Sequence, residues 1–448
     1  MKKLLYHLLP ALLLSAMPAA ALADTSVDST TIVRFFQDGR TGSTKDFVAP
    51  ATEFLTLDAD KLGDGKLSVH LYGWGRVDLA DKSFNNNTFD GSITYAYANY
   101  RFDQANAQIR AGRFFVNEGI VNEQVDGLSA RTDLPLGFGI SAFGGATVHT
   151  AHMANESTDG KGDGIIGGRL NYRYKGMLEL GVSGVYESDA PHLTSPANIA
   201  LENEGKFGSH RLVGGDVWFS PHRVFDIMGH TSYNTETKAV AEHSYLLNVR
   251  PISNLVLTGE FNEYHNRDMF FSSILFASMV DRLNERSRSI GGRASYEFNK
   301  FFELSGDYKH YTRDIGQADR FGGDARLTLL DKTVRAGLGY HYLRSGANFA
   351  LFPAPNASGS FHEARVYAMH DTKGYFSAID AIGYFFKQNI NGRPSAWEVI
   401  GSLGYHITPA LALSGDISYG QNPQFVDELK GLIRLTYNMN YASKGGSK

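Results

Sequence analysis

The sequence predicts an all-β fold, a transmembrane antiparallel up-and-down β-barrel of about 20 strands, within a range of roughly 18–22. Three observations lead to this prediction. Long stretches alternate strictly between apolar and polar residues, the connections between them alternate between short and long, and the chain is exported without cysteine. Aromatic residues make up 12% of the chain, which suits strands.

The alternation is clearest close to the C-terminal end, in GLIRLTYNMNY (431–441). Ile433, Leu435 and Tyr437 fall on one face of an extended chain, and Arg434 and Thr436 fall on the other. The segments 165–174, 302–309 and 411–419 repeat the pattern. A period of two is typical of a strand with one apolar face, and we expect that face to contact lipid.

The spacing of these segments supports a barrel over a soluble sandwich. From 67–79 onward the pattern indicates about twenty strands of roughly 9–13 residues, whereas sandwich strands average about 5–6 residues. Tight links occur near 135, 175, 221, 252, 299, 330 and 408, and longer polar links near 80–91, 149–163, 188–208, 265–286, 344–359 and 420–429. This rhythm predicts short periplasmic turns and long extracellular loops.

The N-terminus has the order of a secretory signal peptide. Lys2 and Lys3 precede an apolar stretch that reaches Leu14, and Ala21-Leu22-Ala23 precedes Asp24. We therefore predict a cleaved signal peptide at 1–23. The remaining predicted parts are a periplasmic or lumenal extension at 24–66, the barrel at 67–441 and a periplasmic tail at 442–448.

Charge and cysteine content narrow the compartment and the partners. The formal charge of -4 becomes -6 when Lys2 and Lys3 are removed, because no acidic residue precedes Asp24. A mildly acidic chain gives no reason to expect nucleic acid as a partner. The absence of cysteine excludes disulfides and covalently attached c-type haem. Together with export, this predicts the bacterial outer membrane as the location and no cofactor.

If the apolar phase contacts lipid, the opposite phase lines the pore. Its charges are balanced in sign, so we expect many of them to pair across strands. The predicted pore-lining residues are Arg110, Arg131, Arg169, Arg173, Glu179, Arg293, Asp307, Lys309, Arg326, Arg335, Asp416 and Arg434.

Arg169 and Arg173 are the best candidates for a local positive patch, because both point inward from one strand at positions four residues apart. The hairpin at YKG brings Arg173 near Glu179. We therefore expect Arg173 to be mainly structural and Arg169 to be the freer charge.

The sequence contains no strong catalytic or metal-binding signature. The glycine-rich GFGISAFGG (137–145) alternates and is therefore a strand rather than a phosphate loop. His149 and His152 lie in a predicted loop without a set of ligands around them, and no G-x-S-x-G motif is present. The sequence thus predicts neither an enzyme nor a metal site. The apolar insert at 267–284 is either a short helix at the barrel mouth or a surface loop.

The segment AQIRAGRFFVNEGIVNEQVDGLSARTDLPLGFGISAFGG (107–145), with LDADKLGDGKLSVHLYGWGRVDL (57–79) before it, resembles bacterial outer-membrane porins. It is most similar to the porin-like barrels of metal-reducing bacteria that can accompany multihaem cytochromes. The resemblance implies a water-filled channel for small polar solutes or ions. The alternative that it implies is the sheath of a porin–cytochrome complex that conducts electrons, and an outer-membrane enzyme or structural barrel is a weaker alternative. The implied partners are membrane lipid, the barrel-assembly machinery, and either multihaem c-type cytochromes or identical subunits.

Overall fold

The computed structural model describes residues 24–37, 47–63, 65–80, 89–148, 164–189, 208–236, 238–265, 286–313, 316–346, 359–423 and 427–441. The predicted signal peptide (1–23), the tail (442–448), the insert at 267–284 and the loop residues His149 and His152 lie outside this part of the chain. No helix among the described residues is long and apolar enough to cross a bilayer.

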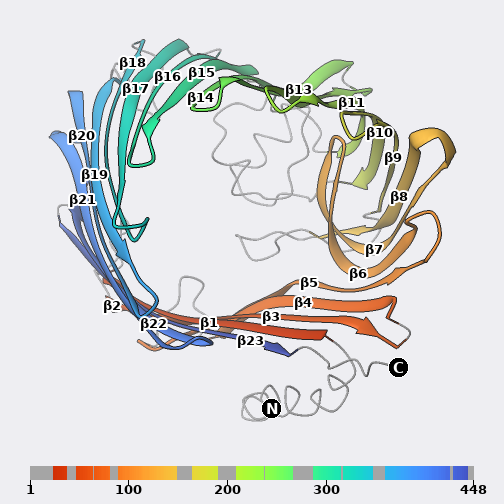
Figure 1. The fold of residues 1–448 in the computed structure, drawn as a ribbon, viewed down its shortest axis with the longest axis horizontal. Helices are drawn as coiled ribbons and strands as arrows, with labels where there is room; N and C mark the ends of the chain where they lie inside the picture. The colour runs from red at the N-terminus through yellow and green to blue at the C-terminus, as the bar shows by residue number, and fades with distance from the viewer. Residues whose placement is uncertain are drawn as a thin grey trace.

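The described chain forms one antiparallel sheet that closes on itself (Figure 1). Of its 23 strands, β2 has two residues and pairs only with β1, and the other 22 form the wall. The predicted transmembrane β-barrel is therefore confirmed, with a strand number at the upper end of the predicted range. The strands, with one 3-10 turn, are β1 (Asp24–Gln37), β2 (Phe47–Val48), β3 (Pro50–Leu62), β4 (Leu67–Asp78), β5 (Phe89–Arg101), β6 (Gln108–Glu118), β7 (Val121–Asp133), η1 (Pro135–Gly137), β8 (Phe138–Thr147), β9 (Ile165–Tyr174), β10 (Leu178–Asp189), β11 (Gly208–His222), β12 (Phe225–Asn234), β13 (Ala239–Ile252), β14 (Leu255–His265), β15 (Arg286–Asn299), β16 (Phe302–Arg313), β17 (Gly316–Leu329), β18 (Val334–Ser345), β19 (Phe361–Asp371), β20 (Tyr375–Ile390), β21 (Arg393–Thr408), β22 (Leu411–Gln421) and β23 (Glu428–Tyr441).

The prediction of an extension at 24–66 is wrong, because this segment supplies two strands of the wall. β1 lies between β23 and β3 and closes the ring at the lower edge of Figure 1. The outward positions of β1 include Ser29 and Thr31, which donate hydrogen bonds to Glu53 on β3. Polar residues on both faces hide the alternation that marks the other strands. Counting from 67 therefore found β4 to β23 and missed β1 and β3.

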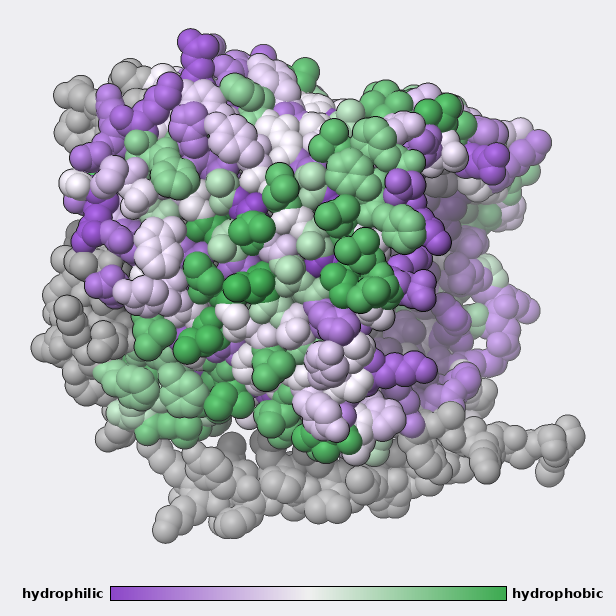
Figure 2. Space-filling model, turned by 60° about the vertical axis from the view of Figure 1, so that its left-hand side comes forward, coloured by the Kyte–Doolittle hydropathy of each residue, from purple (hydrophilic) through white to green (hydrophobic). Residues whose placement is uncertain are grey.

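The outer face of the barrel carries the apolar phase. Figure 2 shows apolar side chains gathered across the outer wall on the side of β18 to β22. Five of them on consecutive strands are Leu338, Val366, Ile379, Leu403 and Ile417, with 55% to 65% of their surface exposed. In water such exposure would be unfavourable, whereas a lipid-facing wall requires it.

Aromatic residues border this apolar band at both rims. Next to the short turns, the rings of Phe138 and Tyr172 lie 5.1 Å apart on β8 and β9. Toward the opposite rim, Trp397 and Tyr419 lie 5.5 Å apart on β21 and β22. Paired aromatic girdles are typical of barrels in a bilayer, where amphipathic rings sit at the headgroup level.

The two rims differ in their connections. On one rim every link is short, as at residues 175–177 between β9 and β10 and at 253–254 between β13 and β14. The opposite rim contains the predicted long connections and also some tight ones. One of the tight links, Gly119-Ile120, joins β6 to β7, and this hairpin positions the candidate site.

Candidate functional site

The tip of the β6–β7 hairpin leaves the wall. β5 pairs with β6 only as far as Ala96 opposite Arg113, and β7 pairs with β8 only from Val125 opposite Thr147. Residues 114–123 pair within the hairpin but with neither neighbouring strand. The hairpin can leave the wall at this level because the backbone of the sheet bends there.

Three glycines on adjacent strands form that bend. Gly112 on β6 lies opposite Gly127 on β7, which lies opposite Gly145 on β8. Gly112 has φ +126°, and a Cβ atom there would lie 2.3 Å from the carbonyl oxygen of Ala96. A Cβ atom at Gly127 would lie 2.1 Å from the carbonyl oxygen of Gly144. The backbones approach so closely that only glycine fits, as expected where a strand bends sharply.

The bent hairpin lies across the inner face of the wall (Figure 1). The backbone amide of Ile120 donates a hydrogen bond to Ser183 Oγ on β10 at 3.2 Å, and Ser141 on β8 donates to Glu118. Phe114 and Val125 are 1% and 0% exposed. The apolar cluster that holds the hairpin contains Phe114, Val116, Val121, Val125, Phe143, Ile165, Val185, Leu212 and Ala241, from strands β6 to β13. Burial of these side chains in a wall that is otherwise polar inside stabilises the folded-in hairpin.

A recess of about 500 Å³ lies where the hairpin and the inner wall of β6 to β9 meet. Four of the predicted pore-lining residues line it together: Arg110, Arg131, Arg169 and Arg173. Glu118 and Asp133 line it as well. The recess therefore combines charges of both signs, and its properties depend on which of them are paired.

Arg169 is held by two acids. Its guanidinium donates to Asp216 on β11, with Nε–Oδ2 at 3.0 Å and Nη2–Oδ1 at 2.5 Å, and lies 2.8 Å from Glu179 Oε1 on β10. The pair with Asp216 crosses the intervening strand above Gly181, where a Cβ atom would lie 2.2 Å from Asp216 Oδ2. Because this glycine has no side chain, Arg169 on β9 and Asp216 on β11 can form an ion pair across β10.

Arg173 is less constrained, which reverses the expectation for these two arginines. Its Nε lies 3.1 Å from Glu179 Oε2, as the hairpin register predicted, and its Nη1 lies 3.4 Å from Asp133. However, the Arg173 side chain is 47% exposed, whereas that of Arg169 is 14% exposed. The prediction that Arg169 is the freer charge is wrong, because pairing extends to a second neighbouring strand that single-hairpin reasoning does not reach.

Arg110 and Arg131 differ from both, because neither has an ion-pair partner among the described residues. Gln108, which is 8% exposed, lies between them. With its amide oriented to satisfy the surrounding donors, its oxygen accepts from Arg110 Nη2 and Arg131 Nε, each at 3.2 Å. The Arg110 guanidinium lies 5.7 Å from the centre of the Tyr97 ring, and its Nε is buried without a hydrogen-bond partner.

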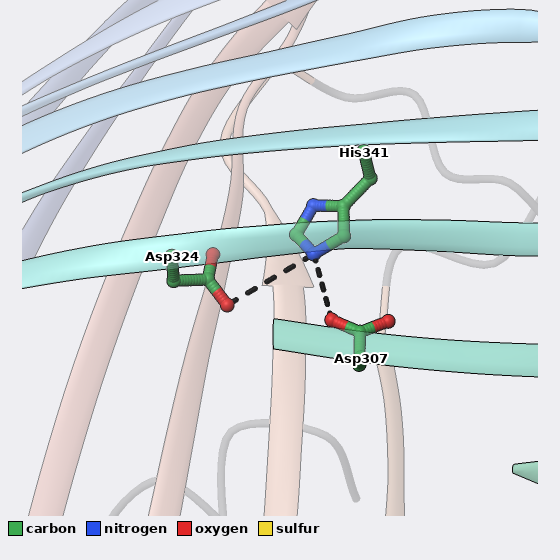
Figure 3. A group of neighbouring side chains, drawn as sticks. All are labelled: Asp307, Asp324 and His341. Carbon is green, nitrogen blue, oxygen red and sulfur yellow. Dashed lines mark hydrogen bonds and ion pairs between the residues drawn. The ribbon is translucent and has the colours of Figure 1, made fainter. Parts of the chain in front are cut away.

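A second recess, of about 490 Å³, lies on the inner wall of β14 to β19. There His341 Nε2 lies 3.0 Å from Asp307 and 3.9 Å from Asp324 (Figure 3). These three side chains are close enough together to hold a metal ion. Asp307 also pairs with Arg320 at 2.9 Å and Asp324 with Arg293 at 3.3 Å. The cluster is therefore neutralised by its own arginines, and we assign no metal to it.

The remaining predicted residues lie at inward positions elsewhere on the wall. Lys309 pairs with Glu260 at 2.6 Å, and Arg326 with Glu303. Arg434 lies 3.7 Å from Asp416. Arg335 has no ion-pair partner in the part of the chain that the structure describes. That these residues line a conducting pore stays a prediction.

Sequence reasoning did not single out His341, Arg320, Glu363 or Arg365, which line the second recess. Alternation carried a usable signal for His341, because it lies between Tyr340 and Tyr342, and Tyr340 is 50% exposed on the outer face. A histidine between two outward tyrosines points inward.

Comparison with known proteins supports the fold. No protein-family model matches the sequence, and no curated protein matches it. The structure is similar to a mutant of the ferric enterobactin receptor PfeA from Pseudomonas aeruginosa, with a TM-score of 0.56 and 9% identity over 93% of this chain and 81% of that chain. For OccAB4 from Acinetobacter baumannii the TM-score is 0.46, with 11% identity over 94% and 98% of the two chains. Identities this low show the fold alone, and no comparison supports the narrower resemblance to barrels of metal-reducing bacteria.

Proposed function

We propose that this protein is an outer-membrane channel for small polar solutes. The observation that carries the proposal is the division of the wall into an apolar outer belt and a charged inner face with two solvent-accessible recesses. A barrel with this division has its polar surface only inside, where water and solutes pass. Most of the ionisable groups that cluster on the inner wall pair with one another rather than with a nucleophile, so transport is favoured over catalysis.

The width of the barrel determines whether a selective channel needs a constriction inside the lumen. Twenty-two strands at about 4.8 Å spacing and about 40° tilt give a backbone diameter of roughly 40 Å. Porins of 16–18 strands leave an aqueous channel, whereas 22-stranded transporters hold a plug. The β6–β7 hairpin narrows the lumen on one side. We infer that it forms part of the constriction that gives the channel its selectivity.

Recording from the purified protein in planar lipid bilayers tests this function. We expect steady ohmic conductance steps that grow with salt concentration. A correctly folded barrel, verified by heat-modifiable migration on a gel, that gives no conductance would contradict the proposal.

The second candidate is the sheath of a porin–cytochrome complex, and the same width favours it. A lumen of this size has room for an inserted protein opposite the hairpin. Purification from the native membrane distinguishes the two functions. Stoichiometric haem absorbance that stays with the barrel through two chromatographic steps supports the sheath, and a colourless conducting barrel supports the channel.

A further inference from the structure

We propose that Arg110 and Arg131 form a binding site for a small organic anion with one carboxylate, at the edge of the hairpin recess. The inference rests on the proposed channel function in one respect: the anion reaches the site through the lumen. It names the class of solute that the channel would select.

Arg110 and Arg131 carry two positive charges that no described carboxylate neutralises. Both guanidinium groups contact the one amide oxygen of Gln108, so two positive charges lie within a few ångströms of each other. Like charges this close repel unless an anion lies between or beside them. Apart from Glu118 and Glu363, every other arginine, lysine, aspartate and glutamate that lines either recess has an opposite charge within ion-pair distance, and Glu363 lies 3.5 Å from His341 Nδ1.

The second argument is the geometry of the donors. Gln108 and the ring of Tyr97 hold the two planar forks in place. Arg110 Nε is buried, and no described residue accepts a hydrogen bond from it. An arginine fork that is positioned but lacks an acceptor suits a carboxylate, which takes two parallel N–H bonds.

The third argument concerns the kind of anion. Glu118 and Asp133 line the recess, and Asp133, Glu179 and Asp216 pair with Arg169 or Arg173 at its wall. The positive pair on β6 and β7 thus faces a surrounding of acids, which disfavours a multiply charged anion. Phe115, which is 41% exposed, lines the same recess and offers an apolar surface to the body of an organic acid.

Titration calorimetry on the full-length barrel in detergent, with benzoate and sulfate as probes, tests the site. We expect benzoate to bind more tightly than sulfate, and we expect Arg110→Gln and Arg131→Gln each to weaken benzoate binding at least about ten-fold, as charged hydrogen bonds predict. Arg335→Gln is the matched control, because it removes one inward arginine that has no ion-pair partner among the described residues but stands alone. It should leave benzoate binding unchanged.

The variants must first show normal heat-modifiable migration, and Arg110→Lys, which keeps the charge but loses the fork, provides a second test. We expect Arg110→Lys to retain part of the affinity. Benzoate binding that survives in the double glutamine variant, or sulfate binding tighter than benzoate, would overturn the proposal. Calorimetry does not depend on conduction. A silent barrel that binds benzoate through this pair therefore refutes the channel and keeps the site, whereas a conducting barrel insensitive to both variants does the reverse.

Discussion

The two recesses are built from the same strand alternation, yet only one of them is neutralised locally. In the recess on β14 to β19, every arginine and lysine has a carboxylate partner, as Lys309 has Glu260. In the recess beside the hairpin, Asp133, Glu179 and Asp216 pair with Arg169 or Arg173, and no described carboxylate pairs with Arg110 or Arg131. The difference arises where the β6–β7 hairpin bends away from the wall. Overall charge balance therefore says little about local pairing, which depends on the strands that become neighbours.

The largest expected effect is on the hairpin itself. Phe114→Ala should loosen its docking by about 3–5 kcal/mol, because the buried ring leaves a cavity in the cluster that holds the tip. Hydrogen exchange of residues 114–124 measures this change, and exchange of β14 to β19 should not move. Phe115→Ala, which changes the exposed neighbour, is the control. Equal protection of the hairpin in both variants would show that the cluster does not hold it.

The apolar residues of the alternating pattern should face lipid on both sides of the barrel, beside the hairpin recess and beside the second recess. Leu170→Lys on β9 and Leu338→Lys on β18 should each cost about 2–4 kcal/mol at mid-membrane, because both leucines lie on the outer face. Reversible folding into lipid vesicles in denaturant measures the loss. If one substitution is neutral and the other is not, the leucine at the neutral position does not face lipid.

Within the hairpin recess, Arg169 should contribute more to the free energy of unfolding than Arg173. Arg169→Gln leaves two largely buried acids without their partner and should cost roughly 1.5–3 kcal/mol. Arg173→Gln should cost about 0–1 kcal/mol, because its pairs are half exposed and solvent weakens them. The same folding assay compares them directly. An equal or reversed order would restore the view that Arg169 is the freer charge.

The smallest effect is expected for an ion pair between the neighbouring strands β22 and β23. Arg434 and Asp416 are 3.7 Å apart and partly exposed, so Arg434→Gln should change the free energy of unfolding by less than about 1 kcal/mol. A loss comparable to that of Arg169→Gln would mean that this pair matters more than its exposure suggests.

Several features of the site can be predicted from the sequence, and others follow from counting residue pairs along the hairpin. Alternation on 165–174 correctly separated outward Leu170 from inward Arg169. The tight link at Gly119-Ile120 also implies that Gln108 faces Arg131 at the eleventh pair of the hairpin, as observed. The glycines Gly112, Gly127 and Gly145 were a visible sign of a bend. Nothing local indicated that the tip would fold onto β10 and β11, because those contacts join residues more than sixty positions apart.

The sequence by itself determined the fold class, the inside and outside of most strands and the charged character of the inner wall. These properties depend on a period of two, which is a local feature of an extended chain. Only the tertiary structure decided that β1 and β3 belong to the wall, since these strands are defined by hydrogen bonds to β23 and β4 rather than by their own pattern. It also decided which arginines are neutralised. The pairing of Arg169 with Asp216 depends on the register of three strands and on the space above Gly181. Register across several strands is a property of the closed sheet, not of any one segment.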